Sequence, residues 1–235
     1  MGELDFFKKL IKNPFDNMTP EEIAAHDAEI KRQEEEQEKR ERIERYKKSG
    51  VPERYFQESL DTYQVTNEMQ KVAAQAIGEF LSEIKCGAFR TLVLIGTAGT
   101  GKTHLACGTV REYGGKYATA PDIVEEIRRA KSFSADQTEK QIIDNYSHVK
   151  LLVVDEIGRG IAATDEKYML YQIINARYNT RKPTVLISNF TKADFLKYIG
   201  VAAADRLVES GNIVEMNGES YRKLRRQNEA CGNVV

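Results

Sequence analysis

The sequence predicts an α/β fold, in which a five-stranded parallel sheet is flanked by helices and preceded by a charged helical arm. Short apolar runs alternate with helical patterns after residue 66, an order that is typical of a parallel sheet covered on both faces. One of these runs leads through a glycine-rich loop into a helical pattern. The segment before residue 50 is dominated instead by a long run of charged residues.

The predicted arm covers residues 1–50. Residues 19–22 (Thr-Pro-Glu-Glu) are typical of a helix start, and the helix is expected to run to about Lys48. It cannot be a core helix, because few apolar residues line it. Two interpretations stay open: a solvated or partly disordered segment, or an extended arm that presents residues 1–30 to a partner protein.

Residues 51–235 are predicted to form one α/β domain, which starts at the glycine and proline that end the arm. Strands are expected at 91–95, 116–120, 149–154 and 183–189, of which 149–154 and 183–189 are predicted to be buried. Helices are expected at 67–85, 103–113, 121–130, 141–146 and 166–179, and the segments 194–199, 202–209, 212–216 and 221–226 complete the chain.

The glycine-rich loop reads Gly96-Thr97-Ala98-Gly99-Thr100-Gly101-Lys102-Thr103, and it joins a strand to a helix. This is the complete pattern of a P-loop, whose backbone N–H groups cradle phosphates at the positive end of a helix. Lys102 is expected to reach the β- and γ-phosphates, and the Thr103 hydroxyl is expected to ligate Mg²⁺. The sequence therefore predicts binding of ATP with Mg²⁺.

Polar residues end the two central strands of the predicted sheet. Asp155 and Glu156 follow 149–154, where Asp155 is expected to hold Mg²⁺ and Glu156 to orient and deprotonate an attacking water. Asn189 ends 183–189, at the sheet edge where ligands bind, and can contact the γ-phosphate or the water. The alternatives are a solvated loop start for the acidic pair and a turn residue for Asn189.

Two arginines near the C-terminus, Arg206 and Arg222, are further candidates, because a guanidinium stabilises charge on a transferring phosphoryl group. Taken alone, each is more typical of a surface ion pair.

The order of these motifs resembles the DnaC family of AAA+ replicative helicase loaders, and nearly as closely the related IstB family of transposition ATPases. The resemblance covers residues 49–226 and includes the His-Leu-Ala that follows the P-loop, starting at His104. It also includes Asp-Glu-Ile-Gly at 155–158, Ala-Asp-Arg-Leu at 204–207 and Ser-Tyr-Arg at 220–222. It implies an AAA+ ATPase domain over 51–235, with His104 at the nucleotide site, and a helicase-binding role for the arm.

The resemblance also implies a role for individual residues. Asn189 corresponds to sensor 1, Arg222 to sensor 2, and Arg206 to an arginine finger that completes the site of a neighbouring subunit. Residues 122–146 match the helical insertion that marks initiators and loaders, where single-stranded DNA lines the inner face of the ring. Four residues of this insertion fit a surface that contacts phosphates and stacks on bases, and they are Arg128, Arg129, Lys131 and Phe133. The alternative is that they form the solvated, basic end of a helix.

Composition limits the remaining function classes. The formal net charge of −1 gives no global basic signature for nucleic acid, so any DNA contact must be local. The three scattered cysteines predict neither a zinc site nor a disulfide framework, and no apolar run is long enough for a bilayer. We therefore expect a soluble, cytoplasmic protein.

The leading hypothesis is an ATP-hydrolysing loader that forms a homo-oligomer with ATP and places a DnaB-like replicative helicase on single-stranded DNA. The alternative is an IstB-type ATPase that assists a transposase on DNA. A small-molecule kinase is disfavoured by Glu156 and by the lack of a recognisable lid. A non-catalytic scaffold is disfavoured because every catalytic position is filled.

Overall fold

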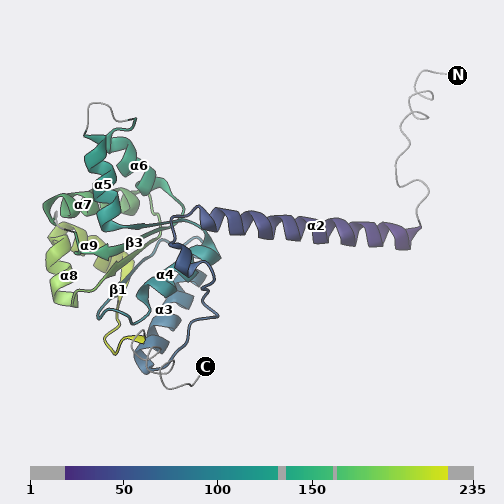
Figure 1. Ribbon diagram of the computed structural model, residues 1–235, viewed down its shortest axis with the longest axis horizontal. Coiled ribbons are helices and arrows are strands. Elements are labelled where there is room, and N and C mark those ends of the chain that lie inside the picture. Colours follow the sequence, from purple (N-terminus) through teal and green to yellow (C-terminus); the bar gives the residue numbers. More distant parts are fainter. Residues whose placement is uncertain (1–18, 132–135, 161–162, 222–235) are drawn as a thin grey trace. The chain divides into compact units, whose positions relative to one another are not determined.

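The computed structural model describes residues 19–131, 136–160 and 163–221 (Figure 1). The chain divides into two compact units, Met1–Glu44 and Arg45–Val235. The sequence placed this boundary at residue 50, whereas the structure assigns residues 45–50 to the second unit. The reason is packing, because Tyr46 and Ser49 are buried in that unit.

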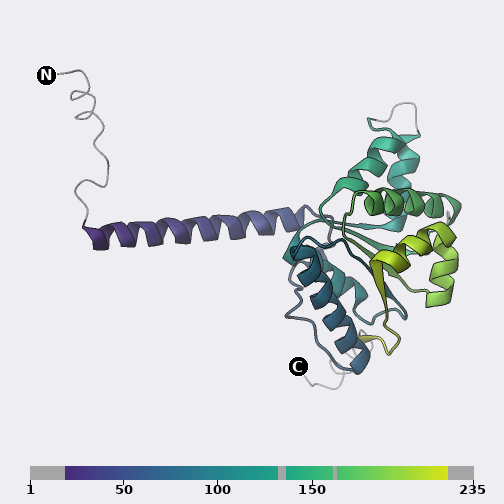
Figure 2. The same ribbon diagram turned by 180° about the vertical axis from the view of Figure 1, so that it is seen from behind.

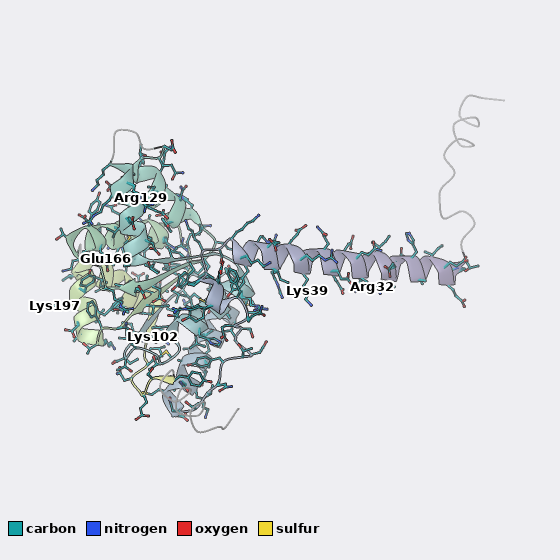
Figure 3. All side chains as sticks on the ribbon, in the orientation of Figure 1. Arg32, Lys39, Lys102, Arg129, Glu166 and Lys197 are labelled. Atoms are coloured by element: carbon teal, nitrogen blue, oxygen red, sulfur yellow. The ribbon has the colours of Figure 1, made fainter. Side chains whose placement is uncertain are left out.

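The described part of the first unit is helical and belongs to α2 (Pro20–Lys47). Thr19 and Glu22 cap it reciprocally: the Glu22 N–H donates to Thr19 Oγ1 and the Thr19 N–H donates to Glu22 Oε2. Between residues 20 and 44 nearly every side chain is exposed, and Figure 3 shows side chains such as Arg32 and Lys39 leaving this helix. Such a helix has no apolar face of its own to bury.

The second unit is built on a parallel sheet of five strands in the order β2-β3-β4-β1-β5, which confirms the predicted fold class. The strands are β1 (Thr91–Ile95), β2 (Lys116–Thr119), β3 (Leu152–Ile157), β4 (Thr184–Ser188) and β5 (Gly211–Glu215). Since β1, β3 and β4 lie inside the sheet, helices cover both of their faces, and this explains their continuous apolar runs.

Helices cover the two faces unequally. On one face α3 (Glu68–Lys85) and α4 (Lys102–Tyr113) pack on Leu92 and Leu94 of β1. The other face contains Val93 and Ile95 and carries five further helices, as Figures 1 and 2 show from opposite sides. These helices are α5 (Ala120–Ala130), α6 (Glu139–His148), α7 (Ala163–Asn179), α8 (Lys192–Ile199) and α9 (Val201–Ser210).

The bounds of β3 differ from the prediction. The strand begins at Leu152 and includes the acidic pair, because Asp155 pairs with Thr119 of β2 and Ile157 pairs with Ser188 of β4. The register of β3 against β4 shifts between Val154 and Ile157. Asp155 and Glu156 are therefore held by the sheet and do not lie in the loop after it.

Arg177 of α7 is the largest fully buried side chain in the described chain. Its guanidinium donates to carbonyl and hydroxyl oxygens near the amino ends of β3 and β4, opposite the edge where Asp155 lies. Burial lowers the pKa of this guanidinium to about 9. Among the described residues, no helix is long and apolar enough to cross a membrane.

Candidate active site

The P-loop joins β1 to α4 as predicted. Its three glycines have positive φ, and Gly101, with φ of 99°, is the N-cap of α4. A Cβ atom at Gly101 would lie 2.6 Å from the ring of Tyr63, so this position needs glycine for both backbone and space. The first N–H groups of α4 and the positive end of its dipole consequently face an open loop, the usual arrangement for an anion.

Lys102 is buried, with 5% of its surface exposed, and Figure 3 labels it inside the second unit. Its ammonium donates to the carbonyl oxygens of Gly96 (2.8 Å) and Thr97 (2.6 Å), which belong to the same loop. The cation is therefore held over the loop that the sequence assigns to phosphate. A phosphate in the loop competes with these carbonyls for the same ammonium.

Asp155 is the best-connected carboxylate of the site. Its Oδ2 accepts hydrogen bonds from Thr103 Oγ1 (2.7 Å) and from the Tyr117 hydroxyl (2.8 Å), and its Oδ1 accepts from the Glu156 N–H (2.6 Å). A hydroxyl beside a carboxylate is a pair of hard oxygen donors, which suits Mg²⁺ completed by phosphate and water. Within the described ranges there is no cluster of three or more His, Cys, Asp or Glu side chains that could hold a metal.

Glu156 has an unusual backbone, with φ of 58° at a non-glycine residue inside a strand. Its carboxylate accepts from the Arg159 guanidinium at 2.8 Å, and both side chains are partly exposed. The turn after β3 is fixed by buried Glu166, whose Oε1 accepts from the Gly158 N–H. Arg159 thus occupies a hydrogen-bonding position on the Glu156 carboxylate in this structure.

One cavity of about 330 Å³ gathers most of the predicted site. Lys102 and Thr103 line it, together with Asp155 and Glu156 of β3 and the exposed Asn189 that follows β4. Sequence reasoning missed five other lining residues, which are Arg54, Tyr55, Tyr117, Arg159 and Ile187. The only signal for Arg159 was its place in the glycine-flanked turn after Glu156, and Tyr117 had none because strand order was not predicted.

His104 lines the same cavity but contacts the segment that precedes α3. Its Nε2 lies 2.8 Å from the Ser59 carbonyl oxygen, and its Nδ1 lies 3.4 Å from a Glu58 carboxylate oxygen. Tyr63 packs edge-on against the imidazole and donates to the Thr100 carbonyl. This segment therefore covers the P-loop and the start of α4.

The two candidate arginines lie outside this cavity or outside the described residues. Arg206 of α9 donates to the Ala202 carbonyl at 2.7 Å, and its guanidinium lies 5.6 Å from the ring centre of Tyr178. It is not among the residues that line the cavity. Arg222 lies outside the described residues, so its predicted role stays a prediction.

The three described basic residues of the predicted DNA surface are exposed or partly exposed, and each lies beside a carboxylate. Arg128 pairs with Asp165 at 2.9 Å, Lys131 lies 3.6 Å from Glu139, and Arg129, labelled in Figure 3, pairs with Glu125. Their positive charge is thus partly offset. Phe133 lies outside the described residues.

Comparison with known proteins identifies a family and several relatives to which this chain is similar. The family model described as IstB-like ATP binding protein matches residues 24–230. A replicative helicase loader DnaC of Buchnera aphidicola subsp. Baizongia pistaciae is 29% identical over 188 residues, which cover 77% of this chain and 76% of that protein. The protein of the same name from Escherichia coli K12 is 29% identical over 183 residues, covering 75% and 74%.

Solved structures share the fold. A crystal structure of the DnaC helicase loader superposes with a TM-score of 0.62 at 22% identity, covering 70% of this chain and 99% of that one. AMPPCP-bound DnaA from Aquifex aeolicus superposes with a TM-score of 0.60 at 20% identity, covering 79% and 58%.

Proposed function

The chain belongs to the IstB-like ATP binding protein family, and on this basis we propose that it is an ATP-dependent DNA replication protein that loads a replicative helicase onto single-stranded DNA. Two relatives named replicative helicase loader align with about three quarters of this chain and of their own length, which supports the proposal. The observation that carries it is the cavity that combines Lys102, Thr103, Asp155 and Glu156.

We propose that this cavity binds ATP with Mg²⁺. The residues fit the ion, because the Thr103 hydroxyl and the Asp155 carboxylate already lie within 2.7 Å of each other at the end of the P-loop. These two residues would hold Mg²⁺, which supplies positive charge against the phosphate oxygens when bound. Lys102 would exchange its two loop carbonyls for phosphate oxygens.

Hydrolysis is assigned to the residues at the carboxyl ends of the strands. Glu156 would orient a water and accept its proton, once its pair with Arg159 has opened. Asn189, in the same cavity, would contact the γ-phosphate or the water, and Arg222 would act as the sensor from the C-terminal segment. Catalysis of this type depends on positioning and on charge stabilisation.

We propose that Arg206 completes the site of a neighbouring copy. The position of Arg206 outside the cavity of its own chain supports a role in trans. ATP then joins subunits into a homo-oligomer, and hydrolysis requires that contact. An isolated chain is accordingly expected to hydrolyse ATP slowly.

The two proposed partners, a helicase and single-stranded DNA, are assigned to two different parts of the chain. The arm, whose exposed charged helix the structure describes over residues 20–44, would bind a DnaB-like helicase, since this helix has no apolar face to bury in a core. Single-stranded DNA would contact Arg128, Arg129, Lys131 and Phe133, where its phosphates must displace the neighbouring carboxylates. DNA binding of this kind is expected to weaken steeply with salt.

A second candidate, an ATPase that assists a transposase on DNA, is favoured by the description of the matching family. We rank it below the loader because the relatives that cover three quarters of this chain are named helicase loaders. The two functions are distinguished by the protein that the chain binds when ATP is present.

The test is co-purification of the full chain with a replicative helicase, with and without ATP. The wild type is expected to form an ATP-sensitive complex, and Lys102→Ala is expected to lose the response. Lys197→Ala, an exposed lysine on α8 that Figure 3 labels, is the matched control and should behave as the wild type. If no ATP-sensitive complex forms, or if Lys102→Ala responds normally, the loader proposal is wrong.

Mixing variants tests the shared site. Arg206→Ala and Lys102→Ala should each be inactive alone, because one lacks the finger and the other lacks the phosphate contact. Mixed subunits create an interface with an intact Lys102 on one side and an intact Arg206 on the other, so part of the ATPase activity should return. Arg206→Ala with normal assembly-stimulated activity would rule out the finger.

A further inference from the structure

Tyr117 of β2 contacts the carboxylate that is assigned to the metal, although no motif includes this residue. Its hydroxyl donates to Asp155 Oδ2 at 2.8 Å, the same oxygen that accepts from Thr103. Tyr117 and Asp155 are both 4% exposed, and the two strands are paired with Tyr117 opposite Val153. The phenol of a tyrosine is protonated at neutral pH and therefore acts as a neutral hydrogen-bond donor.

The backbone of Tyr117 is fixed by the segment that follows α2. Its N–H donates to the Ser49 carbonyl at 2.7 Å, and the Ser49 hydroxyl donates to the Tyr46 carbonyl at 2.6 Å. Gly50 packs so closely that a Cβ atom there would lie 2.2 Å from the Tyr117 carbonyl oxygen. The backbone from which the phenol extends therefore cannot shift unless this segment moves as well.

The hydrogen-bond donors to Asp155 differ in their relation to the proposed metal. The Thr103 hydroxyl can ligate a cation through a lone pair while its O–H still donates to Oδ2, but both ends of this bond then belong to metal ligands. The two donors to the carboxylate that are not themselves assigned to the metal are the Glu156 N–H on Oδ1 and the Tyr117 hydroxyl on Oδ2. Together they fix the plane of the carboxylate and the lone pairs that face the loop.

We infer that Tyr117 is a positioning residue that orients Asp155 for Mg²⁺ and thereby sets the Mg²⁺ dependence of nucleotide binding. Hydrogen-bond donors behind a metal ligand typically change metal affinity by about 10- to 100-fold. The inference rests on the proposed ATP site, but it concerns a residue outside every motif of that site. The competing explanation is that Tyr117 only fills the core beside Tyr46 and Val51.

The experiment measures ATP binding to the full chain by calorimetry, first in EDTA and then as Mg²⁺ is added. Tyr117→Phe keeps the ring and removes only the hydroxyl. It should bind ATP in EDTA like the wild type but need about tenfold more Mg²⁺ for the half-maximal effect. Tyr146→Phe is the control, because Tyr146 is also buried and its hydroxyl donates to Glu126, which does not line the cavity.

The outcomes separate this inference from the proposed function. If the wild type binds no ATP in either condition, the proposed function fails. If ATP binds and Tyr117→Phe has the wild-type Mg²⁺ midpoint, the positioning role is wrong and Tyr117 is a core residue. Thermal unfolding checks that Tyr117→Phe is folded. If Tyr117→Phe does not fold, Tyr117→Met is used in its place, and the same shift of the Mg²⁺ midpoint is expected.

Discussion

Replacing Arg177 with alanine tests how the second unit is held together at the amino ends of its central strands. The Arg177 side chain is fully buried, and its guanidinium donates to five acceptors. These are the Thr184 hydroxyl at 2.8 Å and the carbonyls of Tyr146, Ser147, Val149 and Pro183 at 2.9, 3.0, 3.0 and 2.6 Å. Arg177→Ala leaves these buried acceptors without their donor and leaves a cavity.

The magnitude follows from that geometry. Removing one partner of a buried charged network costs about 3–5 kcal/mol, because each buried acceptor loses its hydrogen bond and cannot reach water. For a domain of this size, each kcal/mol lowers the melting temperature by about 2–4 °C. We therefore expect Arg177→Ala to melt about 6–20 °C below the wild type. Arg177→Met fills the volume without donors and should recover only the smaller, cavity part of the loss.

The measurement is thermal and urea unfolding followed by the near-ultraviolet circular dichroism of tyrosine, since the chain has no tryptophan. The far-ultraviolet signal is less suitable, because it also contains the helix of the first unit. Arg129→Ala is the control, with a side chain that is 74% exposed and an expected change below about 0.5 kcal/mol. A melting temperature of Arg177→Ala within about 2 °C of the wild type would refute the reasoning.

Three further predictions concern the site and its surroundings. Lys102→Ala should weaken ATP binding by about 2–3 kcal/mol, or roughly 30- to 150-fold, because a buried charge-assisted contact is lost; calorimetry showing less than about a threefold change would contradict this. Arg159→Gln should raise the ATPase rate of the isolated chain about two- to fivefold, since an exposed ion pair of up to about 1 kcal/mol no longer restrains Glu156; a slower rate would mean that Arg159 assists the phosphates instead. Burial raises the pKa of Tyr46 and of Tyr63 from 10.0 to about 12, so these phenols ionise at lower pH in the unfolded chain than in the folded chain. Their contribution to the free energy of unfolding should therefore be complete below pH 10 and should decrease as the pH rises toward 12. Urea unfolding at a series of alkaline pH values checks this, and a stability that is flat across the interval would contradict it.

The fold could be predicted from the sequence because its signals are local. Apolar runs of strand length and helical spacing identify β1, β4, α3 and α7 within a few residues. The bounds of β3 were displaced, because Val149 and Lys150 continue an apolar-looking run while pairing with β2 and β4 decides where the strand begins and ends. Pairing is a tertiary property that a single sequence does not display.

The site could be predicted only where a motif fixes spacing. The P-loop and the acidic pair carry their own pattern, so Lys102, Thr103 and Asp155 could be placed without a structure. Tyr117 contacts Asp155 across 38 residues of sequence, and this contact exists only because β2 is the neighbour of β3. Arg177 looks like an ordinary surface arginine of an amphipathic helix, since charge gives no indication of burial.

The left-handed backbone of Glu156 also bears on how this position tolerates substitution. At φ of 58° glycine is the better residue by about 1 kcal/mol, because a Cβ atom crowds the backbone there. A chain selected for stability alone would drift toward glycine and lose the carboxylate. With Glu156 in its proposed role, variants that gain stability at position 156 should be the ones that lose hydrolysis. Screens for thermal tolerance and for ATP turnover would then rank the residues at this position in opposite order.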